Sequence, residues 1–128
     1  MGKTVLVFGN PLVEGDSIAL KVAEELKGKI PGVEFKHVES LDEAEEKKDL
    51  CIMDAVVGIE NVRLIEDIEE LKTTQPVSGH DFDLALELKM LRKVGRVGKV
   101  EIIAIPAECD AKKAAAEAEI LLKRIATN

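Results

Sequence analysis

Three side chains with metal-binding chemistry lie at the edges of apolar segments in this chain. Asp16 lies in the turn after the apolar run TVLVF, Asp54 interrupts the apolar run LCIMDAVV, and His80 directly precedes a predicted helix. Imidazole suits zinc, nickel, copper and iron, and carboxylates accept most divalent ions. Three protein ligands with an open coordination position are typical of catalytic metal sites. The residue types therefore predict a divalent-metal site at Asp16, Asp54 and His80, provided that the fold brings them together.

The two acids also have ordinary structural interpretations. An aspartate at a helix start is a common N-cap, and Asp16 directly precedes a helical pattern. Glu14, in the same turn, fits a solvated turn residue. A lone carboxylate in an apolar strand costs several kcal/mol unless it is paired or binds a cation. Asp54 is therefore the most informative of the acids, although it could also cap a nearby helix or end its strand in water.

The histidines have structural interpretations as well. His80 fits a helix-start or surface histidine, because Ser78 and Asp81 around it form a weak capping-box pattern. His37 falls on the outward positions of an alternating segment, so we expect it to face solvent. The metal-site interpretation thus depends on the combination of three residues and on the fold that positions them.

The elements that must position these residues follow from hydrophobic patterning. Residues 4–8, 50–57 and 100–106 are apolar on both faces, which is typical of strands inside a parallel sheet. Residues 30–38 form an alternating strand, and residues 62–65 a strand too close to Asp54 for a helical crossover, hence antiparallel. Apolar residues at helical spacing predict further elements over 17–27, 81–94 and the Ala-rich stretch from residue 111.

This alternation predicts one domain over residues 1–128 with an α/β fold. We expect a three-layer sandwich in which a five-stranded, mostly parallel sheet with one antiparallel strand carries helices on both faces. Ligands of such sheets bind beyond the carboxyl ends of the strands, near the point where the strand order reverses. The turn with Asp16, the strand with Asp54 and the loop with His80 are predicted to meet there.

Composition excludes several classes of function. The net charge is −7 and aromatic residues make up 2% of the chain, which disfavours nucleic-acid binding. The N-terminal apolar run is too short for a signal peptide or a membrane span, so we expect a cytoplasmic protein with no membrane partner. The chain has no G-x-G-x-x-G, G-K-[ST] or G-x-S-x-G motif, which disfavours a phosphate loop and a serine nucleophile.

Four stretches resemble the maturation endopeptidases of nickel–iron hydrogenases. VLVFGNPLVEGDSIALKV is similar to that family's opening strand, Gly-Asn turn and acid before the first helix, and CIMDAVV to its strand ending in Asp-Ala. SGHDFDLALELKMLRKVG resembles the segment in which a histidine opens a long helix, and VEIIAIP resembles the last strand. The order and approximate spacing agree over nearly the whole chain. The acidic-Gly-Gly segment that many members have after the second strand has no counterpart in FKHVESLDEAEE.

The resemblance implies that Asp16, Asp54 and His80 contact a metal and act in catalysis through it. It implies an endopeptidase that removes the C-terminal extension of the hydrogenase large-subunit precursor after nickel insertion. Nickel would be carried by the substrate and serve as the recognition element, and another divalent metal is compatible with the same ligands. One alternative is a non-catalytic nickel-binding or nickel-sensing domain. Another is a different small α/β protein, such as a nucleotide-binding module.

Overall fold

The computed structural model describes residues 2–13, 15–39, 49–67, 75–76, 84–93, 95 and 98–126. Glu14 and His80 lie outside these residues. The elements, in chain order, are β1 (Lys3–Val7), α1 (Ile18–Leu26), β2 (Val33–His37), β3 (Leu50–Val57), β4 (Arg63–Ile65), β5 (Gln75–Pro76), α2 (Leu84–Lys93), β6 (Val100–Pro106) and α3 (Ala111–Ala126). None of the described helices is long and apolar enough to cross a membrane.

The sheet confirms the predicted α/β topology. Its strands lie in the order β2-β1-β3-β6-β4, and β1 is parallel to both β2 and β3. β3 is parallel to β6, whereas β4 is antiparallel to β6, as its short connection predicted. The two-residue strand β5, which the patterning did not predict, adds a second antiparallel pairing at the end of β3.

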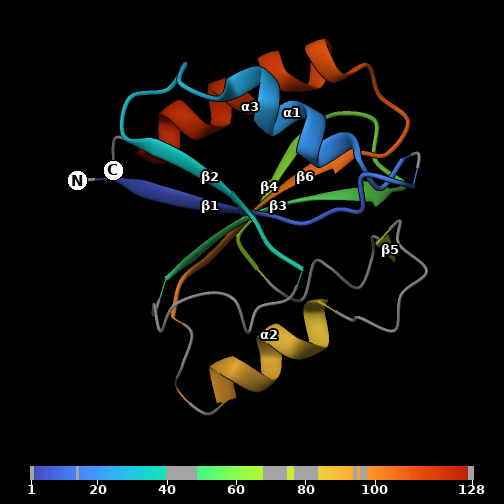
Figure 1. Ribbon diagram of the computed structural model, residues 1–128. Coiled ribbons are helices and arrows are strands. Elements are labelled where there is room, and N and C mark those ends of the chain that lie inside the picture. Colours follow the sequence, from blue (N-terminus) through green and yellow to red (C-terminus); the bar gives the residue numbers. More distant parts are fainter. Residues whose placement is uncertain are drawn as a thin grey trace.

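Helices cover both faces of the sheet. In Figure 1, α1 and α3 lie together on one face, and α2 lies on the opposite face. The three-layer arrangement therefore agrees with the prediction. It follows from the apolar patterning, because a sheet that is hydrophobic on both faces must be covered on both.

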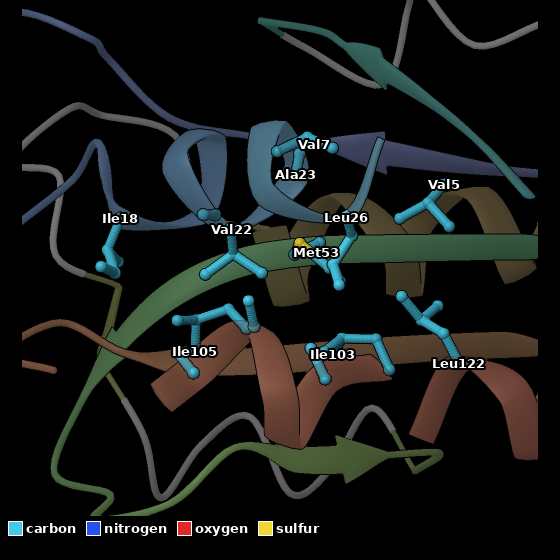
Figure 2. Close-up of a cluster of buried hydrophobic side chains, with 14 of the residues drawn as sticks. Val5, Val7, Ile18, Val22, Ala23, Leu26, Met53, Ile103, Ile105 and Leu122 are labelled. Atoms are coloured by element: carbon cyan, nitrogen blue, oxygen red, sulfur yellow. The ribbon is translucent and has the colours of Figure 1, made fainter. Parts of the chain in front are cut away.

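Strand alternation divides the buried side chains into two clusters. The first packs between the sheet and the α1–α3 layer, and Figure 2 shows Val5, Met53 and Ile103 of the sheet beside Val22 of α1 and Leu122 of α3. The second cluster uses the alternate strand positions and includes Leu88 of α2; its strand members include Leu6, Phe8, Ile52, Val56 and Ile102. Because successive side chains of a strand point to opposite faces, the even-numbered Asp54 emerges on the α2 face.

A buried acid lies near the amino-terminal ends of the parallel strands. Glu101 of β6 is 5% exposed, and Lys3 of β1 places its Nζ 3.0 Å from Glu101 Oε1. Lys99 adds a longer contact of 3.7 Å to Glu101 Oε2. The pair reaches past Cys51 of β3, since β3 lies between β1 and β6. This polar group lies at the opposite end of the strands from the predicted metal site.

Candidate active site

The site lies where the strand order reverses. From β1 the chain passes to β2 on one side, and it later returns to β3 on the other side. Such a point opens a crevice at the carboxyl ends of the strands, where α/β proteins bind ligands. Asp16 follows β1 and Asp54 belongs to β3, so the topology brings the two predicted acids to this crevice.

Asp54 is level with the end of β1. Met53 pairs with Val7, the last residue of β1, and the Phe8 N–H donates to the Met53 carbonyl at 2.9 Å. The alternative that Asp54 ends its strand in water does not agree with the structure, because Asp54 is 9% exposed and β3 continues to Val57, pairing there with β6 and β5. The neighbour β1 stops first. Asp54 therefore lies within a long strand yet beside the turn that carries Asp16.

Asp16 closes the turn between β1 and α1. Its carboxylate is buried, with the residue 4% exposed, and Oδ2 accepts a hydrogen bond from the Asn10 N–H at 3.0 Å. The N-cap residue of α1 is Ser17, whose side chain makes no capping hydrogen bond. The described contact of Asp16 is thus across the turn, to Asn10. The alternative interpretation of Asp16 as a side-chain cap of α1 is not the one that the structure supports.

Gly9 and Asn10 shape this turn. A Cβ atom on Gly9 would lie 2.5 Å from the Asp16 carbonyl oxygen, so any side chain there would force the two backbone segments apart. The Asn10 side-chain oxygen accepts the Leu12 N–H at 2.9 Å, which tightens the turn in the manner of an Asx turn. The Gly-Asn pair directly after an apolar strand was the sequence signal for this arrangement, although we did not predict either residue as part of the site.

The Asp54 carboxyl group has a strongly perturbed acidity. Burial raises the pKa of Asp54 from 3.8 to about 7, against a smaller lowering by the Ala55 N–H, which donates to Asp54 Oδ1 at 2.9 Å. The negative charge of Asp16 raises this pKa further. The two carboxylates are therefore near enough to interact, and both can be ionised together only at a cost that a bound cation would remove.

The donor set suits a divalent cation. Each described hydrogen bond engages one oxygen of a two-oxygen group, and a carboxylate can bind a metal through its other oxygen. Among the residues that the structure describes, no group of three or more His, Cys, Asp or Glu side chains is placed to hold a metal. Asp16 and Asp54 supply two donors, and His80, outside the described residues, stays a prediction. α2 begins at Leu84. In Figure 1 this first, yellow end of the helix points toward the right of the molecule, as the arrowhead of β3 does.

His37 is close to the site although we expected it only to face solvent. The residue is exposed, as predicted. Its Nε2, however, lies 2.9 Å from the carbonyl oxygen of Gly9, the residue before Asn10. The parallel pairing of β2 with β1 explains this contact, because His37 is paired with Val7 and so lies beside the start of the turn. Alternation along one strand could not reveal it.

Solved structures share this architecture. The NiFe hydrogenase maturation protease HybD from Thermococcus kodakarensis has a TM-score of 0.73 at 20% identity, covering 98% of this chain and 99% of that one. The endopeptidase HycI from Escherichia coli has a TM-score of 0.66 at 18% identity, with 100% and 93% covered. The NiFe hydrogenase maturation protease HycI from Thermococcus kodakarensis KOD1 has a TM-score of 0.59 at 22% identity, with 98% and 93% covered.

The chain has the fold of these maturation proteases. No protein-family model matches the sequence, and no curated protein matches it either. The likeness is therefore one of three-dimensional structure and extends over almost the full length of both chains. It agrees with the topology that hydrophobic patterning predicted.

Proposed function

We propose that this protein is an endopeptidase that removes the C-terminal extension of a nickel–iron hydrogenase large-subunit precursor after nickel insertion. The observation that carries the proposal is the pair of buried acids, Asp16 and Asp54, at the switch point of a sheet shared with maturation proteases. The proposed setting is the cytoplasm, as the sequence led us to expect.

In this proposal nickel belongs to the substrate and is what the site recognises. Asp16 and Asp54 would each offer a carboxylate oxygen to the nickel of the precursor, and His80 would offer an imidazole nitrogen. When bound, the metal can polarise the scissile carbonyl or activate a water molecule. Because these ligands are few, a nickel ion already coordinated by the precursor can complete its coordination here without leaving the substrate.

The protein groups prepare the site for a cation. Burial keeps the Asp54 carboxyl partly protonated near neutral pH, since its pKa is about 7. Metal binding must displace that proton, because a carboxylate ligand is deprotonated. An approaching divalent ion removes the repulsion between Asp16 and Asp54 and makes the ionised pair favourable. The pair of acids is thus poised to discriminate a nickel-loaded precursor from a nickel-free one.

The test is the mass of the precursor after incubation with this protein. Two samples of a hydrogenase large-subunit precursor from the same source are compared, one loaded with nickel and one without it. We expect a C-terminal peptide to be lost only from the nickel-loaded sample. Equal cleavage of both samples would refute nickel as the recognition element. No cleavage of either sample, together with intact Ni²⁺ binding, would favour a non-catalytic nickel-binding or nickel-sensing domain.

A further inference from the structure

Two hydrogen bonds meet on one peptide group at the site. The Gly9 carbonyl lies 2.9 Å from His37 Nε2, and the Asn10 N–H donates to Asp16 Oδ2 at 3.0 Å. Gly9 C=O and Asn10 N–H are the two ends of the same amide. Because a carbonyl oxygen only accepts hydrogen bonds, His37 must be the donor. The contact therefore assigns a proton to Nε2 of the His37 ring.

We propose that His37 is a positioning residue for Asp16 and acts through the Gly9–Asn10 peptide. Hydrogen bonds in a chain polarise one another, so donation to the Gly9 carbonyl strengthens the Asn10 N–H as a donor. The ring also fixes the rotation of the peptide plane, which sets the direction of the N–H toward Asp16. His37 touches neither acid directly in this arrangement, and its effect reaches Asp16 through the backbone.

The strand pairing holds the ring in place for this role. His37 is paired with Val7, and the next residue, Val38, donates its N–H to the Val7 carbonyl at 3.0 Å. Val38 is 1% exposed, so the chain is anchored immediately after the histidine. The contact thus joins the end of β2 to the turn that follows β1.

The consequence for nickel rests on the proposed function. A carboxylate oriented by a hydrogen bond is a better metal ligand, and removal of such an outer partner typically lowers metal affinity about 10-fold to 100-fold. Asp16 has one such partner in Asn10, and His37 supports that partner. We therefore expect removal of the imidazole donor to weaken metal binding by roughly 10-fold, at the lower end of this range, since the effect is indirect.

The first test is solution NMR of the metal-free protein, which does not depend on any activity. A ¹⁵N spectrum of the imidazole should show His37 protonated at Nε2. The Asn10 amide proton should shift upfield in His37→Leu, which removes the donor, and return toward its original position in His37→Gln, whose amide can donate at similar reach. Glu34→Gln, an exposed change on the same strand, is the matched control and should leave the Asn10 signal unmoved. An unmoved Asn10 signal in His37→Leu, or an Nε2 without a proton, would overturn the proposal.

The second test is calorimetric titration of the same variants with Ni²⁺. We expect affinity to fall in His37→Leu and to recover in His37→Gln. A purely structural role would lower the unfolding temperature of both variants and show no rescue by glutamine. Equal affinity in all variants would refute the metal-binding consequence even if the NMR shift appears. Failure of precursor cleavage alone would count against the proposed function and leave the hydrogen-bond relay intact.

Discussion

Asp16 and Asp54 come from different elements, a turn and a strand, yet the charge of Asp16 raises the pKa of the buried Asp54 carboxyl. The two residues lie on either side of the switch point, where β1 and β3 are neighbours. Two acids in this relationship destabilise the metal-free protein and favour a bound cation. The cost to stability and the gain in function can therefore be measured separately.

Asp54→Asn should stabilise the metal-free protein at pH 8. Below pH 4 the folded and unfolded states both hold the Asp54 proton, and between about pH 4 and pH 7 only the folded state holds it. The folded state thus binds more protons, so the Asp54 contribution lowers stability as pH rises through this window. The rise of the Asp54 pKa from 3.8 to about 7 corresponds to at most about 4 kcal/mol. Urea unfolding from pH 4 to pH 8 should show the variant gaining stability relative to wild type. A difference in unfolding free energy between variant and wild type that stays constant from pH 4 to pH 8 would contradict a raised pKa at Asp54.

Asp16→Asn should abolish precursor cleavage without unfolding the protein. The asparagine side-chain oxygen can still accept the Asn10 N–H, so the turn keeps its hydrogen bond, but the charge that binds the metal is lost. We expect the unfolding temperature to stay within a few degrees of wild type. The measurement is precursor mass after incubation with nickel-loaded substrate, with Glu34→Gln as a charge-matched control that should cleave normally. Normal cleavage by Asp16→Asn would show that Asp16 only closes the turn.

Gly9→Ala should be more damaging than alanine at other glycines with positive φ. Gly58 has φ +89° and no neighbouring atom within 4 Å of the place that a Cβ would occupy, so alanine there costs only backbone strain, about 1–2 kcal/mol. At Gly9 the added carbon would lie 2.5 Å from the Asp16 carbonyl oxygen, which forces the turn to move. We expect Gly9→Ala to lose at least about 2 kcal/mol of unfolding free energy and to bind Ni²⁺ more weakly. Equal losses for the two variants in urea unfolding would argue against a close-packed turn.

Lys3→Met should destabilise the protein, because it leaves Glu101 buried with only the longer Lys99 contact. Breaking a buried ion pair from one side costs about 3–5 kcal/mol, and we expect about 2 kcal/mol here since Lys3 is partly exposed. The double variant Lys3→Met/Glu101→Met should recover much of the loss. Lys123→Met, which removes the exposed pair with Glu119, is the control and should change unfolding little. A single Lys3→Met variant as stable as wild type would show that Lys99 suffices.

The two cysteines should differ in reactivity. Burial raises the pKa of the Cys51 thiol to about 12, with a smaller lowering by Lys3 and a raising by Glu101. Cys109 is partly exposed. Because the thiolate is the reactive form, iodoacetamide at pH 8 should label Cys109 first and reach Cys51 only on unfolding. Mass spectrometry of peptides after timed labelling measures both sites, and early labelling of Cys51 in the folded protein would be inconsistent with its burial.

Much of the fold was predictable because its signals are local. β3 and β6 have the predicted bounds. Their residues are apolar at both odd and even positions, which requires that both faces of the strand be covered. The helix predicted over 17–27 corresponds to α1, and Gly28, at φ +76°, follows its end. β5 was not predicted because two residues carry no periodic pattern. It pairs with the part of β3 that extends beyond the end of β1. The position of Asp54 beside the end of β1 could not be predicted for the same reason, since the lengths of neighbouring strands decide where that edge lies.

The sequence by itself determined the class of the fold and the two acids as candidate ligands. Periodicity defines which segments are strands and helices, and an acid in an apolar strand signals a cost that some partner must offset. Only the tertiary structure decided what those acids contact. The Asn10 amide at Asp16, the charge of Asp16 near Asp54 and the His37 ring on the Gly9 carbonyl all join residues that local patterning treats separately. The first of these contacts depends on how the turn folds, and the other two depend on strand register, which is a property of paired strands that no single segment of the chain contains.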